Sequence, residues 1–478
     1  MDDEFTQTLD TVLRRNVAGV DRLIAAERLS GGASQETYRL TVEVDGQPHL
    51  LAMRRAAGGE TGVKVEGRPG LAVEARLFQV ARAAGVPEPE VFYVLQPDDG
   101  LGDGFVMEWL DGETLGARIL RAPELDGIRP RLAREVGQVL ARIHAIDPAA
   151  TGLAPHLEVL APEAFVNRMW TQYREMGTPQ PMIDYSARWL LDHLPEAGEP
   201  RLVHNDFRNG NIMVASDGVK AVLDWEVCHL GDPMRDLGWI CTNSWRFGRR
   251  DLPVGGFGTY DDLFAGYEEV SGRPVDPSRV KFWEVFGSYW WAIGCLKMGD
   301  HYRHGPDPTV ERPGIARRSS ECQVDCVNLL IPGPVELVEA GPPATSTDLP
   351  GTDELLISVR DFLRNEVMKA TEGRTSFMAR VASNSLDIVL RELTLGPAHR
   401  AGELARLRDL MGTEAGADPD DAGTEALALR QALCDALHEG RIPLDRADVI
   451  HHLRTTVVNQ VGIDQPVYSG YQAAITAP

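Results

Sequence analysis

Residues 202–233 constrain the fold more than any other stretch, because they combine a short polar loop with the pattern of a β-hairpin. The apolar runs 212–214 and 219–223 flank a Ser-Asp-Gly turn, which is typical of two antiparallel strands. Asp224 directly follows the second run, so we expect the hairpin to bring Asn211 and Asp224 to the same end. The polar side chains of the loop before the hairpin are His204, Asp206, Arg208 and Asn211.

This grouping of carboxylates, an amide and a cation is suited to phosphoryl transfer. Asp206 is the candidate catalytic base, which orients the attacking hydroxyl and accepts its proton. Asn211 and Asp224 offer hard oxygen ligands of the kind that Mg²⁺ prefers. Arg208 would face the transferring phosphate and stabilise its charge. We expect His204 to pack against the loop, bond to the backbone and hold the loop's shape.

The spacing His-x-Asp-x-x-x-x-Asn, with a second Asp at the end of a hairpin, resembles the catalytic loop and metal-binding turn of the protein-kinase-like fold. Asp-Phe-Arg-Asn-Gly-Asn-Ile, Leu-Asp-Trp-Glu and Gly-Asp-Pro-x-x-Asp-Leu look like the aminoglycoside phosphotransferase family of small-molecule kinases. The long activation loop of a protein kinase does not fit between 224–226 and 231–233. The resemblance covers roughly residues 20–330, is highly specific at 202–237, and implies an α+β, bilobal fold. A β-rich amino-terminal lobe would precede a mostly helical lobe.

In this family a cation on the third strand, usually lysine, holds the nucleotide phosphates. This chain has Arg54 there, and strand alternation places Ala52 and Arg54 on one face. Guanidinium is a planar fork rather than a point charge, so the nucleotide is expected to be held differently. Glu74, early in a predicted helix at 71–84, matches the glutamate that pairs with the strand cation. The alternatives are an exposed arginine at a strand end and a solvated helix glutamate.

Two backbone segments would complete the nucleotide site. The turn Ser30, Gly31, Gly32, Ala33, Ser34 allows backbone N–H groups to close over a phosphate, although a plain hairpin turn has the same pattern. The resemblance places the hinge between the lobes at 107–115, where the Glu108 carbonyl and the Leu110 N–H would hold adenine. ATP is the expected co-substrate, with GTP possible, and Mg²⁺ is the expected cofactor.

The acceptor is less constrained. A loop with aromatic and cationic groups follows the metal-binding turn, and its candidate substrate residues are Trp245, Arg246, Arg249 and Arg250. A solvated basic loop is the alternative. Leu-Asp-Trp-Glu-x-x-His-Leu-Gly-Asp-Pro resembles the kinase-like domains associated with acyl-CoA dehydrogenases, which implies a hydroxyacyl-CoA-type metabolite. An aminoglycoside or macrolide kinase stays open, and so does a nucleotide-binding pseudokinase that acts as a regulatory module.

Other ionisable residues are interpreted as structural. His144 is expected at a helix end, and Asp232 and Asp236 are expected to cap or tie a helix. Cys322 and Cys326 lie one helical turn apart without a nearby histidine pair, which favours buried thiols over a metal site.

The charge balance restricts the partners. With 71 acidic and 48 basic residues the net charge is −23, which argues against a nucleic acid or an anionic membrane. The acidic, polar amino terminus is unlike a signal peptide, and no apolar run approaches the ~18 residues of a membrane span. We therefore expect a cytoplasmic protein with reduced cysteines, acting on a small molecule; the oligomeric state is left open.

Composition changes along the chain predict its domains. A lead-in helix is expected at 1–24, an amino-terminal lobe at 25–110 and a carboxy-terminal lobe at 111–332. A linker rich in proline and glycine at 333–352 then precedes an all-α domain at 353–478. That domain resembles a small helical domain appended to bacterial phosphotransferases. Its helical periodicity runs through 353–370, 377–393, 401–410, 425–438 and 445–461.

Overall fold

The computed structural model describes residues 3–29, 35–62, 67–306, 308–342, 349–413 and 422–477. The chain divides into two compact units. The first comprises Met1–Ala161, Glu196–Cys241 and Trp245–Trp283, and the second comprises Pro162–Pro195, Thr242–Ser244 and Glu284–Pro478. This division differs from the boundaries expected at 111–332 and 353–478, because helices on both sides of the proline-rich segment pack around one hydrophobic core.

The first unit begins with a five-stranded antiparallel sheet in the order β1-β2-β3-β5-β4. The strands are β1 (Arg22–Arg28), β2 (Gln35–Val44), β3 (Gln47–Ala56), β4 (Val91–Val94) and β5 (Gly104–Glu108). The tight turn predicted between β2 and β3 is present, with positive φ angles at Asp45 and Gly46. The predicted helix at 1–24 is too long, because Arg22 already pairs with Glu43 of β2.

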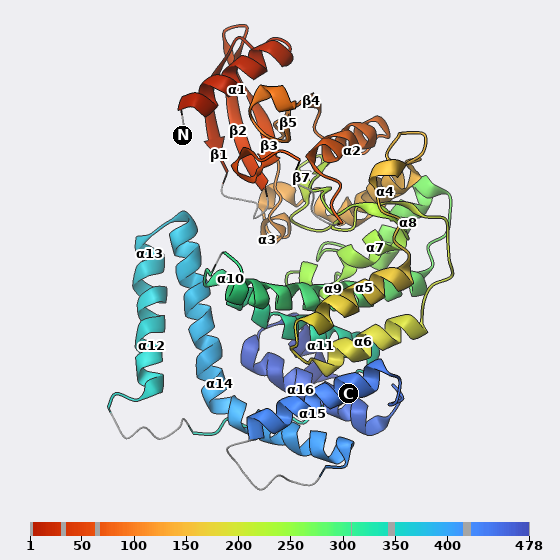
Figure 1. Ribbon diagram of the computed structural model, residues 1–478, viewed down its shortest axis with the longest axis vertical. Coiled ribbons are helices and arrows are strands. Elements are labelled where there is room, and N and C mark those ends of the chain that lie inside the picture. The colour runs from red at the N-terminus through yellow and green to blue at the C-terminus, as the bar shows by residue number, and fades with distance from the viewer. Residues whose placement is uncertain are drawn as a thin grey trace. The chain divides into compact units, whose positions relative to one another are not determined.

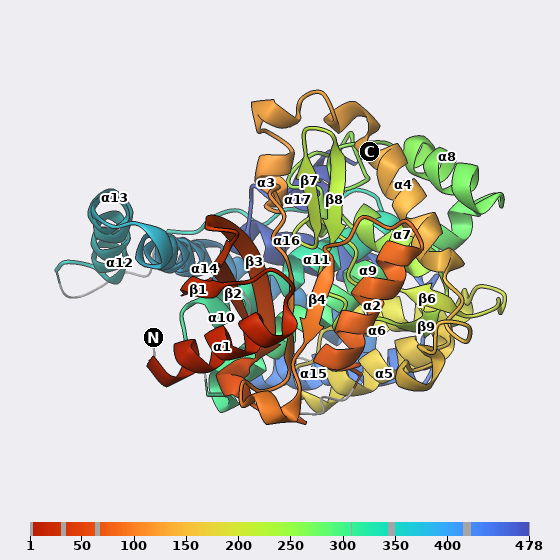
Figure 2. The same cartoon turned by 90° about the horizontal axis from the view of Figure 1, so that it is seen from above.

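Two helices accompany the sheet, α1 (Asp3–Asn16) and α2 (Leu71–Ala83). Helix α2 lies beside β4 and β5 (Figures 1 and 2). Leu9 and Leu13 of α1 are buried in one cluster with Leu40 of β2 and Met53 of β3. This packing gives the third strand, which carries Arg54, a rigid support.

The remaining helices and strands of the first unit lie before and after the polar loop in the sequence. They are α3 (Gly116–Ile119), α4 (Arg129–Ala145), β6 (Arg201–Val203), β7 (Ile212–Ala215), β8 (Gly218–Val222), β9 (His229–Gly231), α7 (Met234–Cys241), α8 (Tyr260–Ser271) and the start of α9 (Pro277–His304). The predicted hairpin is formed by β7 and β8, which lie side by side in Figure 2. Strand β6 pairs with β9, joining Val203 to His229. The loop after β6 and the segment after β8 are therefore both held at their ends.

The second unit is helical. Besides the end of α9, it contains α5 (Pro162–Glu175), α6 (Pro181–Asp192), α10 (Glu311–Arg317), α11 (Ser319–Leu330), α12 (Thr352–Phe362), α13 (Met368–Ala370), α14 (Gly373–Met411), α15 (Ala422–His438), α16 (Ala447–Asp464) and α17 (Ser469–Thr476). Helices α12 and α14 lie side by side in Figure 1. The prediction of separate helices at 377–393 and 401–410 is wrong, because α14 continues through Pro397. Proline removes one backbone donor, and packing of α14 against α12, α15 and α16 favours its continuation.

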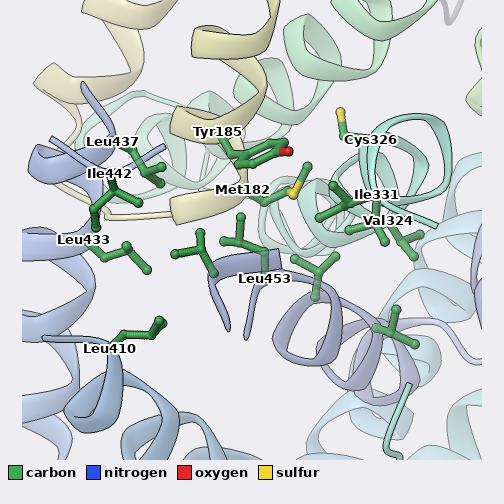
Figure 3. Packing of buried hydrophobic residues seen from close by; sticks show 14 of the residues in the cluster. Met182, Tyr185, Val324, Cys326, Ile331, Leu410, Leu433, Leu437, Ile442 and Leu453 are labelled. Atoms are coloured by element: carbon green, nitrogen blue, oxygen red, sulfur yellow. The ribbon is translucent and has the colours of Figure 1, made fainter. Parts of the chain in front are cut away.

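The core of the second unit joins helices from distant parts of the chain (Figure 3). Met182 and Tyr185 come from α6, and Val324 comes from α11. They are buried with residues of α14, α15 and α16, which include Leu407, Leu410, Leu433, Leu437 and Leu453. The carboxy-terminal helices therefore share a core with α6 and α11.

The expected architecture of an antiparallel amino-terminal sheet followed by helices is confirmed. All six cysteines are buried, with free thiols. Among the described residues, no helix combines the length and the apolar character needed to cross a membrane.

The shared core predicts the behaviour of a cut chain. After cleavage at a protease site inserted between residues 342 and 349, the two pieces should stay together, because apolar side chains of α6 and α11 pack with those of α14 to α16. Size-exclusion chromatography before and after cleavage, with a urea-treated control, measures this. Elution of a separate, cooperatively folded carboxy-terminal fragment would contradict the shared core.

Candidate active site

Asp206 lies in the loop after β6, where its carboxylate accepts hydrogen bonds from three side chains. Arg208 donates to both carboxylate oxygens, at 3.0 and 3.2 Å. Trp239 of α7 donates through Nε1 to Oδ1 at 2.8 Å, and Asn211 donates through Nδ2 to Oδ2 at 2.6 Å. These bonds fix the direction of the carboxylate, which a general base requires. The structure therefore brings Asp206, Arg208 and Asn211 together.

The hairpin sets the position of Asp224 relative to Asn211. The N–H of Leu223 donates to the carbonyl of Asn211 at 2.7 Å, which extends the β7–β8 ladder to the residue before Asp224. Asp224 itself has a φ of 70°, an uncommon backbone conformation for a residue with a side chain. The two residues thus lie at one end of the hairpin.

The donor set at this end fits magnesium. The amide nitrogen of Asn211 donates to Asp206, so its Oδ1 is the atom suited to receive a cation. Asp224 adds carboxylate oxygens, and Mg²⁺ is commonly held by few protein oxygens together with substrate phosphates. Within the described residues, no three His, Cys, Asp or Glu side chains gather as metal ligands. The protein's share of such a site is therefore one amide and one carboxylate.

Arg54 joins the sheet to this end of the hairpin. Its guanidinium is 2.9 Å from Oε1 of Glu74 and 2.5 Å from Oδ1 of Asp224, and Nε donates to Gln35. The side chain of Glu74 is 1% exposed and that of Arg54 is 15% exposed, so neither is a solvated surface group. Burial raises the pKa of Glu74 to about 7, although the charge of Arg54 opposes the shift.

A third carboxylate near this group, that of Glu226, was not among the predicted site residues. Glu226 accepts from Arg68 at 2.7 Å and from Gln35 at 3.4 Å. Gln35 therefore bridges Glu226 and Arg54. Glu226 belongs to the Leu-Asp-Trp-Glu segment, which carried the family resemblance but gave Glu226 no role, and nothing in the sequence pattern singled out Gln35 or Arg68.

Asp236 of α7 holds the backbone of the catalytic loop. Its carboxylate is fully buried and accepts from the N–H of His204 at 2.9 Å and from the N–H of Asn205 at 2.7 Å. His144 of α4 bonds to the same carboxylate at 3.0 Å and to Tyr267 at 3.1 Å. Burial alone would raise the pKa of Asp236, but the hydrogen bonds and charges of His144 and His204 together outweigh it and lower that pKa.

His204 ties the loop to the segment that contains Asp224. Its Nδ1 accepts from the N–H of Asp206 at 3.2 Å, so Nε2 carries the proton and donates to the carbonyl of Leu223 at 3.0 Å. Burial lowers the pKa of His204 and favours this neutral form. The packing position expected for His204 matches its placement.

Asp232 caps the start of α7 and also bonds to side chains of α9. Oδ1 accepts from the N–H of Met234 at the start of α7 at 3.0 Å. Oδ2 accepts from Arg279 and from Trp283, both at 2.7 Å. Asp232 therefore anchors α7 to the start of α9.

Arg235 is a buried cation that the sequence analysis missed. Its Nε donates to Oδ1 of Asn205 at 3.0 Å, and its guanidinium lies 4.7 Å from the ring centre of Trp239. Burial lowers the pKa of Arg235 to about 9. Trp239, which contacts Asp206, was also missed; a buried tryptophan on a helix has no local signal for such a role.

The structure describes only some of the segments that were expected to hold the nucleotide. Ser30, Gly31, Gly32, Ala33 and Ser34 lie outside the described residues. Glu108 ends β5, and its N–H donates to the carbonyl of Glu90 at 2.8 Å. Glu108 and Leu110 border a hollow of about 560 Å³, which Val219 and Lys220 of the hairpin also line.

The expected acceptor loop divides into two parts. Trp245 reaches the catalytic loop, because the guanidinium of Arg208 lies 4.4 Å from its ring centre. Arg246 donates to the carbonyl of Cys241 at 3.0 and 2.7 Å. Arg249 pairs with Asp251 at 3.1 Å, and both Arg249 and Arg250 are exposed. The structure thus brings Trp245 to Arg208, while Arg246 and Arg249 bond locally.

A model of the phosphotransferase enzyme family (APH) matches residues 25–273, more than half of the chain. The chain belongs to this family. A second model, described as a domain of unknown function (DUF6285), matches residues 369–468 of the phosphotransferase.

Known proteins resemble parts of this phosphotransferase. Mouse acyl-CoA dehydrogenase family member 10 is 34% identical over 177 residues, which cover 35% of the chain and 16% of that protein. Acyl-CoA dehydrogenase family member 11 of Pongo abelii is 25% identical over 65% of the chain and 42% of its own length. The chain spans less than half the length of these curated relatives.

A solved structure shows the same fold. A putative aminoglycoside phosphotransferase from Ralstonia eutropha is 22% identical and has a TM-score of 0.56. The similarity covers 68% of this chain and 97% of that one.

The role of Asp236 in this phosphotransferase can be tested by Asp236→Asn. The asparagine amide would place a donor against a backbone N–H, so we expect a loss of about 3 kcal/mol in the free energy of unfolding. Urea unfolding measures it, and Asp217→Asn in the exposed hairpin turn is the control, with an expected change within about 0.5 kcal/mol.

The difference between wild type and Asp236→Asn should also depend on pH. Because the folded pKa of Asp236 is lowered, its contribution is full above the unfolded pKa of about 4 and is lost as pH falls through the folded value. Equal stability of Asp236→Asn and wild type at pH 7 would refute the assignment.

Proposed function

We propose that this phosphotransferase is a small-molecule kinase that transfers the γ-phosphate of ATP to a hydroxyl group. The observation that carries the proposal is the convergence of Asp206, Asn211 and Asp224 at one end of the hairpin, with the buried Arg54–Glu74 pair against Asp224. This combination of base, oxygen ligands and phosphate-holding cation suits in-line phosphoryl transfer. The family membership supports the same chemistry.

Asp206 would act as the base in this proposal. Four side-chain hydrogen bonds hold its carboxylate, so it can accept the acceptor's hydroxyl proton without first reorienting. Arg208 already lies against Asp206 and its cation would face the phosphoryl group as negative charge moves onto the leaving oxygen. Stacking on Trp245 limits the motion of that guanidinium.

Asn211 and Asp224 would hold magnesium. When bound, Mg²⁺ would offset the negative charge of the nucleotide phosphates. Arg54 would hold the α- and β-phosphates while Glu74 keeps its guanidinium in place. Because Arg54 also pairs with Asp224, it links the cation that holds the nucleotide to the carboxylate that holds the metal.

A pair of substitutions tests binding and chemistry separately. ATP with Mg²⁺ should raise the melting temperature of the wild type, since a ligand bound by the folded state stabilises it. Asp224→Asn should remove most of this magnesium-dependent shift. Asp206→Asn should keep the shift and lower turnover at least about 100-fold, because it removes the base. A shift in Asp224→Asn equal to wild type, or none in the wild type with ATP or GTP, would refute the kinase proposal.

For the acceptor, we propose a hydroxyacyl-CoA-type metabolite. Two named relatives are acyl-CoA dehydrogenase family members. A CoA ester carries several phosphate charges, and a chain with a net charge of −23 has to hold them with a local basic patch. Arg249 and Arg250 are exposed on the loop that brings Trp245 to the catalytic loop. An aminoglycoside, being cationic, would be repelled by these arginines.

The acceptor proposal predicts a selective kinetic effect. Arg249→Glu with Arg250→Glu should raise KM for a 3-hydroxyacyl-CoA by about tenfold or more and leave KM for ATP nearly unchanged, because charge-assisted contacts to the acceptor are lost. Steady-state kinetics measures both constants. Arg131→Glu with Arg273→Glu, an equal charge change at other exposed positions of the same unit, is the control. Unchanged KM for the acyl-CoA would rule out this loop.

A further inference from the structure

A cavity of about 210 Å³ lies among the helices of the second unit. Part of its wall is apolar and belongs to the hydrophobic core, including Met182 and Leu453, which Figure 3 shows. The rest of the wall is polar. Its uncharged polar side chains are Gln180, Ser319, Ser320, Gln323, Thr456 and Gln460. A pocket with one apolar side and several convergent polar groups is the usual form of a small-molecule site.

His452 of α16 lines this cavity with an unsatisfied hydrogen-bonding atom. The residue is 1% exposed, and its Nδ1 has no partner. Other polar atoms buried nearby on α14 and α16 lack partners as well: both ring nitrogens of His399, Nε of Arg406 and Oγ1 of Thr455. Among these residues, His452 is the one that lines the cavity. Buried polar groups are almost always paired, so an unpaired one in a residue of a cavity wall points to a ligand.

The carboxylates at the cavity are already neutralised. Both oxygens of Glu403 accept from Arg430, at 2.6 and 2.5 Å. Asp464 accepts from Arg317 at 2.7 Å and from Ser320 at 2.8 Å. These carboxylates are therefore poorly placed to bind a cation.

Arg406 is positively charged, and within the described residues no carboxylate forms an ion pair with it. Its Nη2 donates to Oγ1 of Thr456 at 3.0 Å, and Thr456 lines the cavity. Burial lowers the pKa of Arg406. Burial also lowers the pKa of His452 to about 3; the charge of Glu403 opposes this shift, and the charges of Arg406 and Arg430 add to it. Arg406 therefore places a positive charge behind Thr456, while Glu403 is held in its pair with Arg430.

We propose that this cavity binds a small organic anion, whose carboxylate or phosphate group is received by His452 and Thr456 with Arg406 behind them. The amides of Gln323 and Gln460 are available at the same cavity for the polar remainder of the molecule. Leu296 and two wall segments, at 180–182 and 316–323, lie outside the region matched by the DUF6285 model. The wall residues on α14 to α16 lie within it. The site is thus built from the helices that share the core of the second unit.

An anion in this position would change the titration of His452. The charged groups around it are Glu403 and Arg406 on α14, Arg430 on α15, His451 and Asp464 on α16, and Arg317 on α10. A bound negative charge stabilises the imidazolium, so it raises the pKa of His452. By linkage, the anion binds more tightly as pH falls.

The test uses the full chain and two probes, succinate and inorganic phosphate. Succinate carries no phosphate, so it separates this cavity from the kinase site. Calorimetry should show saturable binding that weakens by about tenfold or more in His452→Gln and in Thr456→Val. His451→Gln, the exposed neighbour on the same helix, should bind like the wild type. The ¹⁵N signal of the His452 imidazole should show a higher pKa with succinate bound.

Four outcomes would overturn the proposal. They are no saturable binding of either probe to the wild type, equal binding by the wild type and a folded His452→Gln or Thr456→Val, equal affinity for the neutral succinamide, and an unchanged His452 signal. If His452→Gln does not fold, Thr456→Val decides the question alone. The magnesium-ATP melting shift reports the kinase site separately, so failure of one proposal is distinguishable from failure of the other.

Discussion

The conformation of the catalytic loop depends on the hydrogen bonds that the buried carboxylate of Asp236 accepts. This carboxylate accepts two successive backbone N–H groups, those of His204 and Asn205, and is itself held by His144. Asn205 has a φ of 69°, a conformation that a non-glycine residue adopts at a cost, and these bonds offset that cost. Because the backbone is fixed at this point, the side chain of Asp206 projects from the loop in one direction.

The positively charged side chains at the site counteract, over short distances, the negative field of the whole protein. The chain carries a net charge of −23, yet Arg54 lies between two carboxylates and Arg208 lies against a third. Each cation is held by more than one partner, which limits the reorganisation that a polyanionic nucleotide would require. Arginine suits this arrangement better than lysine would, because its fork bonds to Glu74, Asp224 and Gln35 at once.

Helices of the second unit come from both regions that the family models match. Residues 162–195 fall within the match to the phosphotransferase family. Their helix α6 contributes to one core with α14, α15 and α16, which the second family model covers in full. The carboxy-terminal helices are therefore part of a common hydrophobic core rather than an independent attachment. The polar cavity lies in the same set of helices, lined from α6, α11 and α16.

What the sequence determined by itself is local: the turn between 212–214 and 219–223, the spacing that brings Asn211 to Asp224, and the strand and helix that carry Arg54 and Glu74. Turn chemistry and side-chain periodicity act over a few residues, so they can be read without a structure. Tertiary structure decided the contacts between distant positions: Asp236 with His144, Trp239 with Asp206, and Gln35 with Arg54. It also decided that α14 continues through Pro397 and that its core includes α6, because burial against remote helices outweighs local propensity.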